Sequence, residues 1–101
     1  MDDEIMTTVG RECYSFDGRI LEIFGRDHTI RFHIRHMYVR VTGPDRRGKR
    51  VVEIGHGRPE YSGGCHIWRY TAAEWEQARG LAALLEAVQA AIDSAPGHGP
   101  V

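Results

Sequence analysis

Cysteine is scarce in this sequence, and long hydrophobic runs are missing. The chain of 101 residues has two cysteines, Cys13 and Cys65, and small secreted domains that need disulfides usually have more, so we expect free thiols. The longest apolar run, residues 81–85, is far shorter than the roughly 20 residues that cross a bilayer. The chain begins with acidic residues rather than an apolar segment, which argues against a secretory signal peptide. Together these absences predict a soluble, cytoplasmic protein without a transmembrane segment.

Motifs of catalysis and metal binding are missing as well. The sequence has no C-x-x-C or H-x-x-x-H spacing, no glycine-rich phosphate loop, no nucleophile elbow and no convincing carboxylate pair. A metal site would have to converge from adjacent strands, on His56, Cys65 and His66, with Cys13 as an additional candidate. A Cys65 thiol with His66 as its base is no better supported, because neighbouring strand residues point to opposite faces. We therefore predict no enzyme activity, no metal and no cofactor.

The chain lacks a large excess of either charge, because its net charge is −1. The charges are nevertheless unevenly distributed along the sequence. Residues 1–25 have two arginines and six acidic residues, residues 26–69 have ten basic and four acidic, and residues 70–101 have one arginine and four acidic. A basic middle therefore lies between acidic ends. These charges either neutralise one another across the fold or leave a basic patch for an anionic partner.

The composition is that of one globular domain. Hydrophobic residues make up 42% and charged residues 27% of the chain, both ordinary values. The length suffices for one domain and not for two. We predict a flexible leader at residues 1–10, a single domain at residues 11–94 and a disordered tail at residues 95–101.

Alternating apolar residues predict antiparallel strands. Asp17 and Gly18 form a two-residue turn signal, and pairing Phe16 with Arg19 places four apolar residues on one face: Tyr14, Phe16, Leu21 and Ile23. Residues 29–35 alternate in the same way, with Ile30, Phe32 and Ile34 on the apolar side. The alternation slips near His36, which predicts a bulge or turn before a strand at residues 37–41.

Glycine and proline divide the next part of the chain. Residues 43–50 are predicted to form a turn, with Pro44 setting one φ angle and Gly48 allowing a positive one. Residues 51–54 then form a strand. Residues 55–64 contain four glycines and a proline, so we expect a loop, with room for one short strand. Residues 65–70 form the last strand.

The helix is the best-specified element. Thr71 and Glu74 form a capping box, and Tyr70 and Trp75 have the spacing of a hydrophobic staple. A helix over residues 71–92 has one apolar stripe, made of Trp75, Ala78, Leu81, Ala82, Leu85, Val88 and Ile92. Gly80 weakens the helix by about 1 kcal/mol relative to alanine, which a close approach to the sheet would explain.

The order of these elements predicts an α+β fold: a bent antiparallel sheet or partly open barrel of five to seven strands, closed by one C-terminal helix. It resembles the bacterial pleckstrin-homology-like domains in residues 16–21, 29–34 and 71–92. The resemblance implies seven strands, one of them within residues 56–64. It also implies a domain that binds peptides or phosphoinositides, although the lipid-binding members have several cations at the first hairpin turn and this chain has only Arg19 there.

Two rows of cations could bind an anion. The first row, on the turn at residues 43–50, is Arg46, Arg47, Lys49 and Arg50, and the second is Arg31 and Arg35, on either side of His33. Facing the same way, they would form a pocket for phosphate or carboxylate. The alternative is a solvated hairpin whose charges discourage pairing between sheet edges.

Three functions remain open at this point. The first is a non-enzymatic binding or interaction domain for a protein or peptide partner. The second is anion binding through the basic region 31–50, with a phospholipid head group or nucleic acid as ligand; Tyr61, Trp68 and Tyr70 could stack on bases. The third is a small enzyme with its site in the mouth of the barrel.

Overall fold

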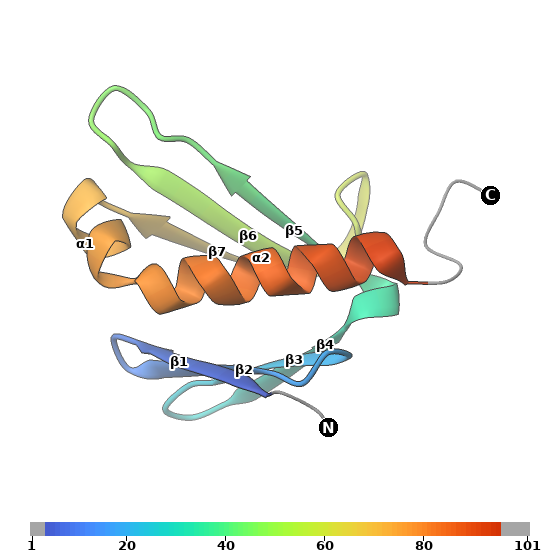
Figure 1. The fold of residues 1–101 in the computed structure, drawn as a ribbon. Helices are drawn as coiled ribbons and strands as arrows, with labels where there is room; N and C mark the ends of the chain where they lie inside the picture. The colour runs from blue at the N-terminus through green and yellow to red at the C-terminus, as the bar shows by residue number, and fades with distance from the viewer. Residues whose placement is uncertain (1–3, 96–101) are drawn as a thin grey trace.

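Seven strands form two antiparallel sheets in the computed structural model, which describes residues 4–95, with the backbone alone for residues 61–63 (Figure 1). The first sheet contains, in spatial order, β1 (Ile5–Val9), β2 (Glu12–Phe16), β3 (Ile20–Phe24) and β4 (Thr29–His33). The second contains β5 (Met37–Thr42), β6 (Arg50–Arg58) and β7 (Tyr61–Tyr70). A short 3-10 helix, η1 (Ile34–His36), joins the two sheets, and α1 (Ala72–Gln77) and α2 (Arg79–Ser94) follow. The predicted α+β fold class is confirmed.

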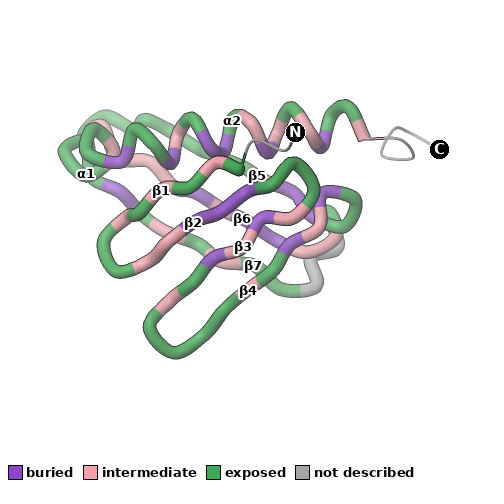
Figure 2. The backbone as a smooth tube through the Cα atoms, turned by 60° about the horizontal axis from the view of Figure 1, so that its bottom comes forward, coloured by how far each residue is buried: buried purple, intermediate pink, exposed green. Residues whose placement is uncertain are grey.

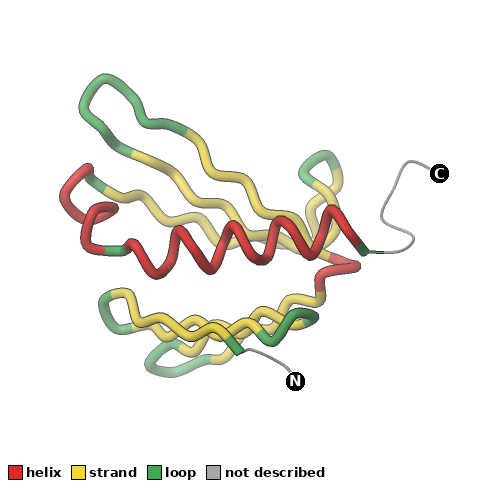
Figure 3. Tube along the Cα trace, in the orientation of Figure 1, coloured by secondary structure: helices red, strands yellow, loops and turns green. Residues whose placement is uncertain are grey.

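Helix α2 lies along the open side between the two sheets, where it contacts β1, β5 and η1 (Figure 3). The inner faces of both sheets and the apolar side of α2 enclose one core, seen as the buried segments of β2, β3, β6 and α2 in Figure 2. The predicted inner face of the first hairpin is confirmed, because all four of its apolar residues are buried. The predicted stripe on the helix is confirmed for Ala78, Leu81, Leu85, Val88 and Ile92, which are buried together with Leu84, whereas Ala82 is only half-buried.

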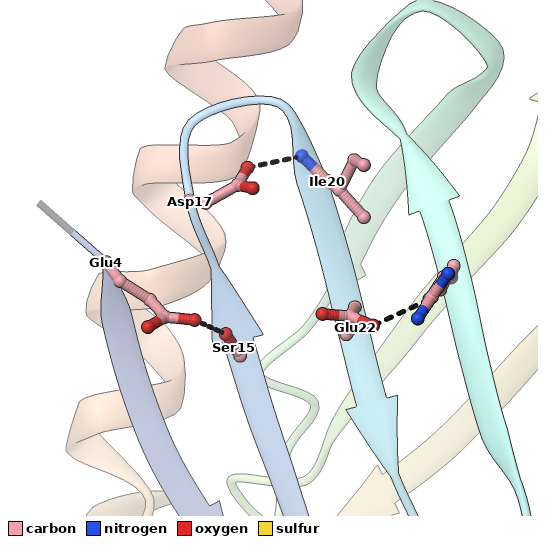
Figure 4. A network of polar contacts seen from close by, with 6 residues as sticks. Glu4, Ser15, Asp17, Ile20 and Glu22 are labelled. Carbon is pink, nitrogen blue, oxygen red and sulfur yellow. Dashed lines mark hydrogen bonds and ion pairs between the residues drawn. The ribbon is translucent and has the colours of Figure 1, made fainter. Parts of the chain in front are cut away.

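The predicted register of the first hairpin is wrong, although the predicted faces are right. Phe16 pairs with Leu21 rather than with Arg19. The Asp17 carboxylate accepts hydrogen bonds from the backbone amides of Arg19 and Ile20, each at 2.8 Å, and so closes a longer turn (Figure 4). Because the register slips by an even number of residues, every side chain keeps its face.

The prediction of a flexible leader at residues 1–10 is wrong for Ile5–Val9, which form β1. This strand pairs with β2 along its whole length, and Ile5 and Val9 pack against the core. Ala95, assigned to the tail, caps α2 and also packs against the core. Residues 1–3 and 96–101 lie outside the described residues, so the rest of the leader and tail predictions stays untested.

The predicted loop at residues 55–64 is mostly strand, since β6 continues to Arg58 and β7 begins at Tyr61. The glycines have specific places there. Tyr38 lies over Gly55, where a Cβ atom would overlap its ring, and Gly57 has a φ of 82° beside a register shift. The seventh strand implied by the resemblance is therefore β1, and not a segment within residues 56–64.

The helix begins as predicted and then breaks once. Both hydrogen bonds of the capping box at Thr71 and Glu74 are present, and the rings of Tyr70 and Trp75 are 5.6 Å apart. The predicted single helix is interrupted at Ala78, whose φ and ψ of −102° and 38° are not helical. Gly80 then passes so close to Thr7 of β1 that a Cβ atom would lie 3.1 Å from the Thr7 Cβ and closer still to its Oγ1. The close approach expected at Gly80 is confirmed.

Candidate functional site

The first basic row lies on the loop between β5 and β6. The Asp45 carboxylate accepts the backbone amides of Lys49 and Arg47 at 2.9 Å and 2.8 Å, and these bonds shape the loop and lower the pKa of Asp45. The side chains of Arg46, Arg47 and Lys49 are exposed. Arg50 differs from them, because its guanidinium lies over the Trp75 ring, 5.2 Å from the centroid. Three of the four cations therefore face water, and the fourth packs on α1.

The second basic row is not adjacent to the first. Arg31 lies on the outer face of the first sheet, where its Nε is 2.7 Å from Oε2 of Glu22, the β3 residue labelled in Figure 4. Arg35 lies in η1, at the other end of β5 from the basic loop. The six residues of β5 separate Arg35 from that loop by about 20 Å at roughly 3.3 Å per residue. The structure therefore places the two rows apart rather than around one pocket.

A groove lies between β5 and α2. Its cavity has a volume of about 310 Å³, and most of its lining is apolar: Val39, Val41, Trp75, Ala82 and Leu85, with Glu86 and Gln89 at the rim. Val41 is 43% exposed, which is unusual for a valine on the inner side of a sheet. The groove therefore presents apolar surface to solvent next to a strand.

That strand is the edge of its sheet. β5 pairs with β6 on one side only, and among the described residues no strand pairs with its other side, which faces α2. An edge strand offers unpaired backbone N–H and C=O groups, which form a template for another extended chain. The free edge and the apolar cavity lie on the same side of β5.

Polar contacts on the outer face hold β5 firmly against β6. The Tyr38 hydroxyl donates to the Glu53 carboxylate, and Nη2 of Arg40 lies 2.6 Å from the other oxygen of that carboxylate. These contacts, first with Tyr38 and then with Arg40, lower the pKa of Glu53. Both partners come from β5, so the free edge of this strand is fixed in place.

The histidines of the second sheet are half-buried and stack on aromatic rings. His56 stacks on Phe32 with ring centroids 4.4 Å apart, and His66 stacks on Trp68 at 5.5 Å. Burial lowers the pKa of His66. Cys65 is exposed, and within residues 4–95 no group of three or more potential ligands among His, Cys, Asp and Glu is placed to hold a metal ion.

The aromatic residues considered for base stacking belong largely to the core. Tyr70 is buried, and Trp68 is partly buried against the core beside Tyr14. The side chain of Tyr61 lies outside the described residues. Neither Trp68 nor Tyr70 therefore offers an exposed ring face beside the basic loop.

Sequence reasoning found the cations but missed the groove. Ala82 was assigned to the core-facing stripe, and Val41 to the inner side of a strand. Leu85 is buried in the core, as predicted, and also borders the groove. The one signal available was the width of the stripe, because residues 81, 84, 85 and 88 already fill a core-facing side and residues 82, 86 and 89 form a second side next to it.

No protein-family model matches the chain, and neither does any curated protein or any solved structure. Among the helices described, none is long and apolar enough to cross a membrane. The case for a function accordingly comes from the geometry of the groove between β5 and α2.

Proposed function

We propose that this domain binds an extended peptide segment of a partner protein in the groove between β5 and α2. One observation carries the proposal: β5, the edge strand of its sheet in the described part of the chain, borders an apolar cavity that is open to solvent. The seven strands in two sheets with a C-terminal helix are consistent with the pleckstrin-homology-like resemblance, which includes peptide-binding members.

Strand addition supplies both affinity and selectivity in such a site. The backbone of the peptide pairs with β5, and every second side chain of the peptide points toward the groove. A cavity of about 310 Å³ is at the small end of ligand pockets, which span roughly 300–1,000 Å³. We therefore expect it to take one large apolar side chain, in contact with Val41, Trp75 and Leu85.

The charges around the groove favour a peptide with an acidic end. Arg50 lies over Trp75 at the end nearest the basic loop, and Arg46, Arg47 and Lys49 continue beyond it. Exposed cations of this kind raise the association rate and set the direction of a charged partner more than they raise its affinity. The expected motif is an apolar residue with acidic residues on the side of the peptide that lies nearest the basic loop.

A peptide-display selection on the full chain tests the proposal, followed by fluorescence anisotropy of the selected peptides. Val41→Glu should weaken binding at least about tenfold, since it places a charge in the apolar cavity. Phe24→Glu is the matched control, because Phe24 is also an exposed apolar strand residue, 37% exposed, but lies on β3 in the other sheet. Equal binding by the two variants would contradict the site.

The same experiment separates peptide binding from the alternative of anion binding. Among the described residues no ion pair involves Arg46, Arg47 or Lys49, which is the observation in favour of an anionic ligand on this loop. If reversing these three charges abolishes binding of a ligand, while Val41→Glu still binds it, the result would support the anion hypothesis and reject the groove.

A further inference from the structure

A second cavity, with a volume of about 560 Å³, lies where the turn between β2 and β3, the helix η1 and the last turn of α2 meet. It is separate from the peptide groove, because different residues of α2 line the two. Its polar lining side chains come from three parts of the chain: Arg19, His33, Arg35 and Ser94.

Backbone contacts hold the two arginines on neighbouring segments. The amide of Ile34 donates to the carbonyl of Arg19 at 2.9 Å, which ties the β2–β3 turn to η1. Neither Arg19 nor Arg35 has an ion-pair partner within the part of the chain that the structure describes. The cavity is therefore lined by two arginines that form no ion pair with any carboxylate of residues 4–95.

His33 adds a third donor. Its Nδ1 accepts the backbone amide of Arg35 at 3.1 Å, so the neutral ring carries its proton on Nε2. The remaining ring nitrogen is thus a donor in both protonation states. Ser94 adds a hydroxyl, and none of the described residues that line the cavity has a carboxylate side chain.

The carboxylates nearest in sequence already accept hydrogen bonds, although the charge of Arg19 also contributes to the lowered pKa of Asp17. Asp17 accepts the amides of Arg19 and Ile20, and Asp93 accepts Nε2 of Gln89 at 2.9 Å. The C-terminal end of α2 also brings partial negative charge to one side of the cavity, and α2 has no basic residue in its own last turn. The competing explanation for the positions of Arg19 and Arg35 is therefore that their positive charges balance the partial negative charge at this end of α2.

We infer that this cavity binds an oxyanion, and that a phosphate monoester fits it best. Two guanidinium groups offer the forked donors that phosphate oxygens accept in pairs. The cavity is much larger than a phosphate group, and Ile34 and Ala91 give the rest of it an apolar wall for the organic part of the ester. Recognition requires Arg19, Arg35 and the Nε2 donor of His33.

Titration of the full, ¹⁵N-labelled chain with glycerol 3-phosphate tests the inference, with sodium chloride holding the ionic strength constant. The amide NMR signals of residues 18–19, 33–35 and 91–95 should shift and saturate. Arg19→Gln and Arg35→Gln should each weaken binding at least about tenfold. Arg31→Gln is the matched control, because Arg31 is an exposed arginine on β4, in the first sheet, and does not line the cavity.

Several outcomes overturn the inference. Wild-type signals that never saturate, or that shift mainly in another part of the chain, rule the cavity out. This test uses the wild type, so it holds even if a variant fails to fold. A melting temperature lowered by Arg35→Gln, without any saturable shift in the wild type, assigns the arginines to the end of α2 instead.

A vesicle experiment separates the two sources of a phosphate monoester. Sedimentation with phosphatidylcholine vesicles, with and without phosphatidic acid, tests for a lipid head group. If the protein sediments only with vesicles that contain phosphatidic acid, and Arg35→Gln abolishes this, the cavity binds the head group of a lipid. If glycerol 3-phosphate binds saturably but the protein does not sediment with the vesicles, the cavity binds a small soluble phosphate ester.

Discussion

At the scale of single residues, two aspartates build two turns in the same way. Asp17 and Asp45 each accept two backbone amides within their own turn, and these bonds lower the pKa of both carboxyl groups. The Asp17-Gly18 pair predicts a two-residue turn, but such a turn needs a positive φ at both positions, and only Gly18 has one. The side-chain bonds of Asp17 favour the longer turn instead, which is why the predicted register fails.

His66 makes the native state sensitive to pH. Its ring is partly buried beside Trp68, and burial is the main cause of its lowered pKa. His28 and His56 act in the same direction, and Glu12 opposes them. The native state therefore favours the neutral ring more strongly than the unfolded state does.

The direction of the effect follows from proton binding. As the pH falls through about 6.5, the ordinary pKa of histidine, the unfolded chain takes up a proton before the native protein does. The free energy of unfolding should therefore be lower at about pH 5.5 than at about pH 7.5. Urea unfolding at the two pH values measures it. His66→Phe should reduce the difference, whereas the exposed control His36→Gln should keep it; an undiminished difference in His66→Phe would contradict this origin.

At the scale of elements, the contact between α2 and β1 depends on Gly80 and Thr7. Alanine at position 80 would gain about 1 kcal/mol of helix propensity in an exposed helix. Here its Cβ would collide with the Thr7 side chain, so we expect Gly80→Ala to lower the free energy of unfolding. Thr7→Ala removes the closest atom and should make the second substitution less costly or favourable. A double-mutant cycle by chemical denaturation measures this coupling, and additive effects would contradict the contact.

The elements differ in how well the sequence predicts them. The helix start is predictable because its signals are local: Thr71 and Glu74 are three residues apart, and Tyr70 and Trp75 five. β1 is not, because Thr7 takes an inward position where an apolar residue would mark the strand, and the close passage of Gly80 suits a small side chain there. The groove is harder still, since Val41 and Leu85 meet only in the folded chain.

At the scale of the whole molecule, α2 contacts both sheets, which also contact each other directly where Phe32 stacks on His56 and Tyr14 meets Trp68. No pair of strands joins the first sheet to the second, so their link in the described chain consists of η1, core side chains and α2. Both proposed sites also use α2: the groove faces β5, and the oxyanion cavity lies at the last turn. The groove therefore requires α2 to be docked beside β5, and the oxyanion cavity requires its last turn to be docked beside η1 and the β2–β3 turn.

Leu84 tests this connection, because it is fully buried on α2 at the centre of the core. Leu84→Ala should lower the free energy of unfolding by about 2–5 kcal/mol, the usual cost of a cavity in a core. If α2 couples the sheets, amide hydrogen exchange should become faster in β2, β3 and β6 by a similar factor. Met6→Ala is the control, since Met6 is 59% exposed and should change little. Faster exchange confined to one sheet would mean that the sheets open independently, and that α2 is not what joins them.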